Sequence, residues 1–268
     1  MPATIHDTTP DPEAGGLAPF KQVMYDNYDQ THRNYGNHTE SAWQARFQGH
    51  VQVLRAMLPP GKSAPILDLG CGDGLLLAVA QALGYTNLAG VDLSDTLIRS
   101  AAKRSRAKLY NEDGLEFLRS QPDGAFEAII AFDIFEHLTR PYLFEISREI
   151  ARVLKPGGRL ILRVPNGCSP LYGRLLWSDL THERPFTAGA IQQLLLPLGF
   201  DRIEPRDFAP FEVRGIKSAI MAAAWQIFRA VTLLRVALEL GRASGEVLTI
   251  NLHIIAHKRN SEPGCSEG

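Results

Sequence analysis

The sequence lacks an excess of charge of either sign. Its 28 lysines and arginines are balanced by 29 aspartates and glutamates, so the net charge of the 268-residue chain is −1. Proteins that bind DNA or RNA through phosphate contacts usually carry a surplus of basic residues on the binding face. We therefore expect no nucleic-acid partner.

Cysteine is also scarce. Cys71, Cys168 and Cys265 are the three cysteines, and they are too far apart to give the paired spacing of a zinc site or a disulfide framework. Residues 1–19 contain no long apolar run, so we expect a disordered tail there, not a signal peptide. Together these features favour a cytoplasmic protein.

No long hydrophobic run is free of charge. The most apolar stretch, Ile216–Leu240, is interrupted by charged residues, among them Arg229 and Arg235. Each charge at the centre of a bilayer costs roughly 2.5 to 3.5 kcal/mol on insertion scales, which disfavours a spanning helix. Two alternatives stay open: a helix or helical hairpin that packs over an acceptor pocket or in a homodimer contact, or one that lies in a membrane interface and makes the protein peripheral to the membrane.

Residues 66–74 carry the strongest functional signal in the chain. An apolar strand, Pro65–Leu69, runs into Gly70, Gly72 and Gly74, and an apolar helix follows from Leu75. Glycines in such a turn permit positive φ and let a ligand approach the backbone. The pattern predicts a site for a nucleotide cofactor.

The spacing and the charges of this turn distinguish between two cofactors. A dinucleotide fingerprint has the spacing Gly-x-Gly-x-x-Gly, and here the third glycine comes one residue early. Asp68 and Asp73 would repel a pyrophosphate but suit a ligand with an ammonium group and hydroxyls. Asp92 ends a second strand, where a carboxylate can accept hydrogen bonds from ribose hydroxyls. S-adenosylmethionine meets all of these requirements.

At this point the chain resembles the class I, or seven-stranded, S-adenosylmethionine-dependent methyltransferases. The resemblance extends from about Ile66 to Gly199 and includes the glycine turn, the acid Asp92, the turn Asn111–Gly114, the stretch Phe132–Leu138 and the turn Arg152–Gly158. It implies that the cofactor contacts a set of residues in these motifs: Asp68, Gly70, Gly72, Asp92, Leu93, Asp113, Gly114 and Phe132.

The resemblance also implies a fold. We expect an α/β, doubly wound and mostly parallel seven-stranded sheet whose last strand is antiparallel. Residues 61–258 would form this domain, with 216–240 as a helical insertion before the last strand. A helical cap would occupy 20–60, and residues 259–268 would be a second disordered tail.

Candidate catalytic residues follow strand four of this expected sheet. Asp133, Glu136 and His137 would lie at the carboxyl edge, where open α/β folds bind ligands, and His182 precedes the helix that leads to strand six. Transfer of a methyl group to a hydroxyl requires a base, and His182, His137 and Asp133 are the candidates. The sequence therefore favours an O-methyltransferase.

Two narrower resemblances leave the acceptor open. The run Asp133-x-x-Glu136-His137 and the long apolar segment resemble the ubiquinone-biosynthesis O-methyltransferases, which implies that Asp133, Glu136 and His137 bind Mg²⁺ or Zn²⁺. The stretch Asn166–Arg174 with Thr181–Glu183 is similar to methyltransferases of polysaccharides and sugars. The acceptor is then a small molecule, sugar or glycan, or else a quinone or lipid-like molecule at a membrane. A binding subunit without turnover is a further alternative.

Overall fold

A computed structural model describes residues 39–208, 215–241 and 247–260. The two expected tails, apart from residues 259 and 260, and the first half of the expected cap lie outside the described residues. The expectations for the central domain and for the apolar insertion both fall within them.

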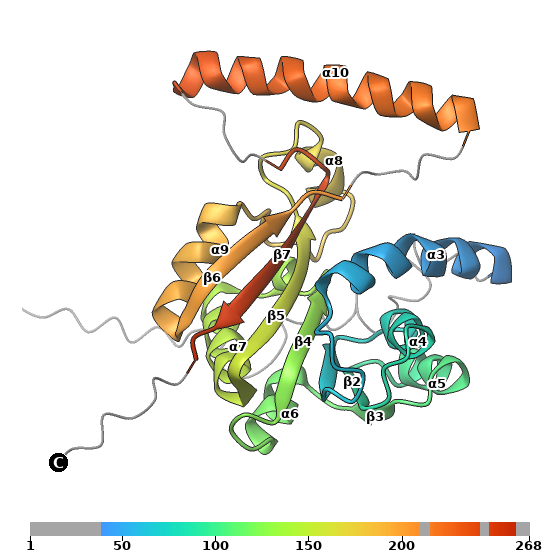
Figure 1. The fold of residues 1–268 in the computed structure, drawn as a ribbon. Coiled ribbons are helices and arrows are strands. Elements are labelled where there is room, and N and C mark those ends of the chain that lie inside the picture. Colours follow the sequence, from blue (N-terminus) through green and yellow to red (C-terminus); the bar gives the residue numbers. More distant parts are fainter. Residues whose placement is uncertain (1–38, 209–214, 242–246, 261–268) are drawn as a thin grey trace, which may run out of the picture.

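The core is one seven-stranded sheet with the strand order β3-β2-β1-β4-β5-β7-β6 (Figure 1). Strands β1 to β5 pair in parallel, whereas β7 is antiparallel to both of its neighbours, β5 and β6. The fold expectation is therefore confirmed. The strands are β1 (Ile66–Leu69), β2 (Leu88–Asp92), β3 (Lys108–Asn111), β4 (Phe126–Phe132), β5 (Leu154–Pro165), β6 (Phe200–Arg206) and β7 (Asn251–Lys258).

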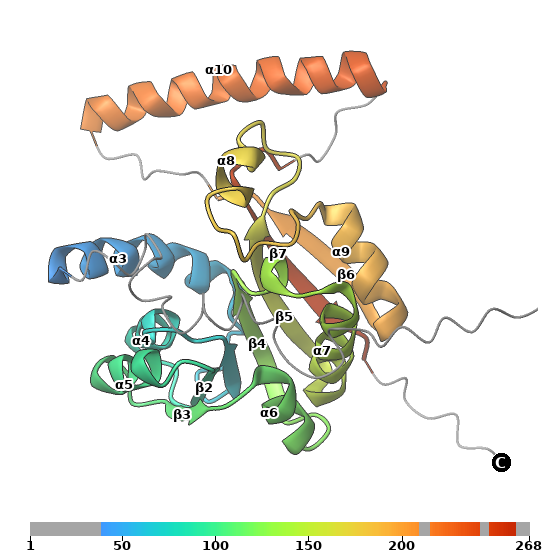
Figure 2. The ribbon, with the colours of Figure 1, turned by 180° about the vertical axis from the view of Figure 1, so that it is seen from behind.

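Helices cover both faces of this sheet (Figures 1 and 2). One hydrophobic cluster joins the sheet to α3 and α4, and a second joins its other face to α6, α7 and α9. Short helices η1, α8 and η2 lie in the connections. The helices are α3 (Glu40–Met57), α4 (Leu75–Ala82), α5 (Asp95–Arg104), α6 (Gly114–Ser120), η1 (Phe135–His137), α7 (Arg140–Val153), α8 (Tyr172–Leu176), α9 (Ala188–Leu195), η2 (Leu196–Leu198) and α10 (Gly215–Leu240).

The glycine turn between β1 and α4 has the backbone geometry that its sequence predicts. Gly70, Gly72 and Gly74 all have positive φ, between 52° and 77°. A Cβ atom on Gly74 would come within 2.8 Å of the Ala101 Cβ, and one on Gly70 would overlap the side chain of Ile134. These positions require glycine because the backbone there is both left-handed and tightly packed.

Helix α3 is the described part of the expected cap. Thr39 caps it, since its hydroxyl accepts a hydrogen bond from the Ala42 backbone N–H. Its buried residues Leu54 and Met57 belong to the same hydrophobic cluster as α4. The Arg46 guanidinium donates to both carboxylate oxygens of Asp73 at 3.1 and 3.3 Å, so α3 is tied to the glycine turn itself.

The apolar insertion forms a single helix, α10, that lies beyond the end of the sheet (Figures 1 and 2). Its length and composition would allow it to cross a membrane, but none of its most apolar window is buried inside the protein. The expectation of a helix is confirmed. The large apolar side chains of α10 are exposed to solvent, and its expected position over an acceptor pocket or in a homodimer contact stays a prediction.

Candidate functional site

The acid at the end of β2 is built into the glycine turn. Asp92 Oδ2 accepts a hydrogen bond from the Gly72 backbone N–H and Oδ1 accepts one from the Ser94 N–H, both at 2.9 Å. Its burial raises the pKa of this carboxyl, although the two N–H donors oppose the rise. Each carboxylate oxygen can accept a second hydrogen bond. Asp92 thus shapes the turn and can also bind a hydroxyl.

Asp68 presents an unsatisfied carboxyl group at the same place. It is 1% exposed, and neither of its oxygens has a hydrogen-bond partner among the described residues. Burial, together with the nearby Asp92 and Asp73, raises its pKa well above the usual value. A buried charge without a partner is costly, so this position calls for a proton or for a bound cationic group.

The other expected cofactor residues have defined structural surroundings. Asp113 caps α6 by accepting from the Leu115 and Glu116 N–H groups, and the Tyr142 hydroxyl donates to its carboxylate at 2.7 Å. Gly114 packs against Leu69, whose Cδ1 would lie 2.8 Å from an added Cβ. Leu93 is half exposed and Phe132 is buried. Leu93 therefore offers an apolar surface beside Asp92.

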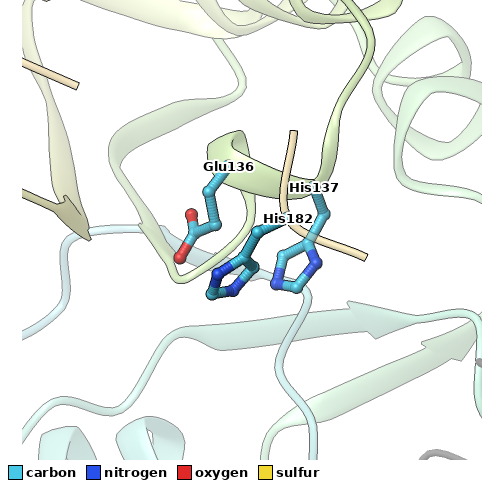
Figure 3. A group of neighbouring side chains, drawn as sticks. All are labelled: Glu136, His137 and His182. Carbon is cyan, nitrogen blue, oxygen red and sulfur yellow. The ribbon is translucent and has the colours of Figure 1, made fainter. Parts of the chain in front are cut away.

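A second group of polar side chains gathers where β4 ends (Figure 3). Glu136 and His137 belong to η1, and His182 comes from the segment before α9. Their ligating atoms all lie within 4.8 Å of one another, and the two imidazole rings meet edge to face with centroids 4.6 Å apart. The backbone also joins the two segments, because the Glu183 N–H donates to the Glu136 carbonyl. The structure brings together the two histidines that the sequence placed 45 positions apart.

Hydrogen bonds fix the proton positions on both rings. The Thr181 hydroxyl donates its proton to Asp179 Oδ1 at 2.6 Å, so its oxygen accepts from His137 Nδ1 at 2.7 Å. His182 Nδ1 lies 3.2 Å from the Leu176 carbonyl oxygen, which can only accept. In the neutral form each ring therefore carries its lone pair on Nε2. That is the state required of a general base or of a metal ligand.

Glu136 has the most unusual electrostatic setting in this group. It is 1% exposed, and its Oε2 has no hydrogen-bond partner within the described ranges. The pKa of Glu136 is raised well above its usual value, mainly by burial and secondly by the nearby Asp133 carboxylate. A cation bound beside this carboxyl would favour its charged form.

Asp133 belongs to a different arrangement from the one expected. Its carboxylate forms a two-pronged ion pair with the guanidinium of Arg163 on β5. This pair holds the pKa of Asp133 below its usual value, although partial burial opposes the effect. The possible metal ligands that the structure brings together are Glu136, His137 and His182, with His182 in the place expected for Asp133.

The Asp133 backbone is also strained. Its φ of 56° makes it the one residue other than glycine with positive φ in the part of the chain that the structure describes. His50 of α3 extends the ion pair, because its Nε2 accepts from Arg163 at 2.6 Å while its Nδ1 donates to the Arg46 carbonyl. Burial and Arg163 lower the pKa of His50 to about 4. The neutral imidazole thus links α3 to the ends of β4 and β5.

Residues 66–158 match the family model described as Methyltransferase domain. The ubiquinone biosynthesis O-methyltransferase of Xanthomonas campestris pv. campestris (strain B100) is 34% identical over 118 residues, which are 42% of this chain and 47% of that protein. The enzyme of the same name from Maricaulis maris (strain MCS10) is 30% identical over 42% of this chain and 45% of its own length. The chain thus spans less than half the length of these curated relatives.

Solved structures agree with this match at the level of the fold. An S-adenosylmethionine-dependent methyltransferase from Archaeoglobus fulgidus superposes with a TM-score of 0.59 at 22% identity, and the match covers 79% of this chain and 94% of that protein. For one from Mesorhizobium loti the TM-score is 0.54 at 22% identity, and the match covers 79% of this chain and 100% of that protein. Residues 66–158 therefore match a methyltransferase domain, and the seven-stranded sheet has the fold of these S-adenosylmethionine-dependent methyltransferases.

The methyltransferase domain implies S-adenosylmethionine as cofactor, and the residues present fit it. The three positive-φ glycines leave the backbone open to a ligand, and the unsatisfied carboxyl of Asp68 can accept from an ammonium group. Asp92 stands beside the same turn with unused acceptor capacity. The individual contacts expected for Asp68, Gly70, Gly72, Asp92, Leu93, Asp113, Gly114 and Phe132 stay predictions.

Several residues that shape this site were not predicted from the sequence. Asp179 and Thr181 orient His137, Arg163 pairs with Asp133, and Arg46 pairs with Asp73. Arg163 had a visible signal, since it is a charged residue inside the apolar run of β5. The other pairings depend on contacts between distant segments, which no local pattern reveals.

Proposed function

We propose that the protein is an S-adenosylmethionine-dependent O-methyltransferase that acts on a hydroxyl group of a small molecule, sugar or glycan. The observation that carries the proposal is the chain Asp179–Thr181–His137, which leaves the lone pair of His137 on Nε2. His137 lies three residues after Ile134, whose side chain packs on Gly70 of the cofactor turn. If the cofactor binds in this turn, a base on η1 would be close to it.

The residues of this site have separate tasks in the proposed reaction. When bound, S-adenosylmethionine supplies an electrophilic methyl group and leaves as the thioether. His137 Nε2 removes the hydroxyl proton as the acceptor oxygen forms its bond to the methyl carbon. Asp179, acting through Thr181, stabilises the imidazolium that results, since it lies at the far end of the hydrogen-bond chain. His182 positions the acceptor or shares the role of base.

Methyl transfer from labelled S-adenosylmethionine to a panel of hydroxyl acceptors tests this proposal. The change His137→Gln should lower turnover by roughly 100-fold or more, the usual contribution of a general base, and leave cofactor affinity unchanged. His182→Gln is the matched comparison, and a larger effect there would exchange the roles of the two histidines. Cofactor binding without any product across the panel would favour a binding subunit without turnover.

The alternative acceptor is a quinone or lipid-like molecule at a membrane surface. Two observations favour it. The curated relatives are named for ubiquinone biosynthesis, and helix α10 exposes an apolar surface beyond the sheet end that carries the site. A phenol has a more acidic hydroxyl than a sugar, so this acceptor would depend less on the base. Comparing His137→Gln with phenolic and with sugar acceptors separates the two classes.

As the alternative to a general-base role for His137, we also propose that Glu136, His137 and His182 hold a divalent ion, with His137 Nε2 as a ligand and not as the base. The unsatisfied Oε2 of Glu136 supports this proposal, as do the two imidazoles that carry lone pairs on Nε2. Two nitrogens and one oxygen suit Zn²⁺ better than Mg²⁺, which prefers oxygen ligands. A bound ion would act as a Lewis acid on the acceptor oxygen. We expect a chelator to abolish the activity of the wild type and added Zn²⁺ to restore it. We also expect Glu136→Gln to lose Zn²⁺ binding.

A further inference from the structure

Exposed large apolar side chains are concentrated at one end of the molecule. Four of them, Leu171, Tyr172, Trp177 and Leu180, belong to α8 and the segment around it, and eight more belong to α10. Among the described residues, the only other exposed large apolar side chains are Leu93, Tyr110, Phe144 and Leu196. Helices α8 and α10 lie at the same end of the sheet in both views (Figures 1 and 2). This end of the molecule therefore has a surface that water solvates poorly.

The apolar residues of α10 form one stripe along the helix. At 3.6 residues per turn its six most exposed large residues fall within an arc of about 60°, and the neighbouring alanines widen this arc to about 140° without a polar residue. The six are between 62% and 82% exposed: Ile216, Ile220, Ile227, Val231, Leu234 and Leu238. We call them the α10 stripe.

The charged residues of α10 lie outside the stripe. Arg229 is on the opposite side of the helix, where its guanidinium lies 3.8 Å from the Asp207 carboxylate just after β6. Lys217 and Arg235 border the stripe near the two ends of the helix, and Arg235 also pairs with Glu239. The arginine in the middle of the apolar segment is therefore directed to the methyltransferase domain, and the α10 stripe points away from it.

The chain is too short at α10 for this helix to cross a bilayer. The 26 residues of α10 would extend about 39 Å, enough to cross a hydrocarbon core of about 30 Å. However, β6 and β7 are neighbours in one sheet, so the chain must return to the side from which it left. Seven residue steps from Leu240 to Val247 reach at most about 25 Å. An α10 that meets a bilayer must lie flat on it.

We propose that α10 and the segment around α8 bind the surface of a lipid bilayer, with the α10 stripe buried among the acyl chains and Lys217 and Arg235 at the level of anionic headgroups. A flat amphipathic helix bordered by cations is suited to this interface. A second copy of the chain is a poorer fit, because a two-helix seam would leave the four exposed residues around α8 uncovered. The proposal goes beyond the proposed methyl transfer and does not depend on it.

Vesicle co-sedimentation tests the proposal with phosphatidylcholine vesicles and with vesicles that also contain phosphatidylglycerol. The full chain should bind both and should bind the anionic vesicles more tightly at low salt. The triple change Ile227→Glu, Val231→Glu and Leu234→Glu should weaken the partition by at least about tenfold, because it places charge in the stripe. Trp177→Glu with Leu180→Glu should weaken it as well.

The control is the double change Phe144→Glu and Leu196→Glu, which adds charge at exposed apolar positions elsewhere and should leave vesicle binding unchanged. Calorimetry with S-adenosylmethionine shows whether each variant is folded, and its result decides the cofactor site independently. Absence of vesicle binding by the wild type would overturn the proposal. So would a dimer in sedimentation velocity that the triple change converts to a monomer without affecting vesicle binding.

Discussion

Asp92 is the residue whose replacement tests the cofactor site most directly. Its carboxylate holds the Gly72 and Ser94 N–H groups and is expected to accept from the ribose hydroxyls. Asp92→Ala should weaken S-adenosylmethionine binding by about 1.5 to 3 kcal/mol, the scale of hydrogen bonds to a charged group. Calorimetry measures this change, and thermal unfolding of the unliganded variant shows whether the turn survives. Unchanged affinity would contradict the ribose assignment.

His50 makes the stability of the folded protein depend on pH. Its folded pKa of about 4 lies below the ordinary value of 6.5, so between these values the unfolded chain binds the proton more readily than the folded chain does. This residue therefore destabilises the protein as pH falls from about 6.5 toward 4. His50→Gln removes the titrating group and keeps an acceptor for Arg163.

The expected result is a difference between two pH profiles. Urea unfolding at pH 7 and at pH 5 should show that the wild type loses more stability than His50→Gln over this interval. The comparison isolates His50, because the buried carboxyls of Asp68 and Glu136 are present in both proteins. Parallel losses in the two proteins would show that His50 is not the group that titrates.

At the scale of elements, α3 is held against the cofactor turn by the ion pair between Arg46 and Asp73. The side chains of this pair are 29% and 12% exposed, so solvent screens it less than it screens a surface pair. Arg46→Ala should lower the free energy of unfolding by roughly 1 to 2 kcal/mol, between the values usual for exposed and buried pairs. It should also weaken cofactor binding, since Asp73 lies within the turn.

Arg99→Ala is the matched control for this change. Arg99 pairs with Asp95 on α5, and both side chains are more than half exposed, at 74% and 54%. Its removal should cost less than about 0.5 kcal/mol and leave the cofactor affinity unchanged. Equal effects of the two changes, measured by urea unfolding and calorimetry, would show that α3 is not tied to the turn by Arg46.

On the scale of the whole molecule, the sequence predicted what depends on local pattern. The strand that ends in Gly70, Gly72 and Gly74 and the acid Asp92 were readable because each signal lies within a few neighbouring residues. The chain from Asp179 to His137 and the pair of Asp133 with Arg163 were not, since they join segments that meet only in the folded sheet. The orientation of α10 likewise required Asp207, the partner of Arg229.

Cofactor binding should stabilise the whole molecule, because the turn, β2 and α3 all converge on one site. S-adenosylmethionine at 100 times its Kd should add about 2.7 kcal/mol to the free energy of unfolding if only the folded chain binds it. For a domain of this size, that gain corresponds to a rise in Tm of roughly 5 to 11 °C. Asp92→Ala at the same cofactor concentration should show a clearly smaller rise. Scanning calorimetry with and without cofactor measures both, and an equal rise in the two proteins would place the binding energy elsewhere than at Asp92.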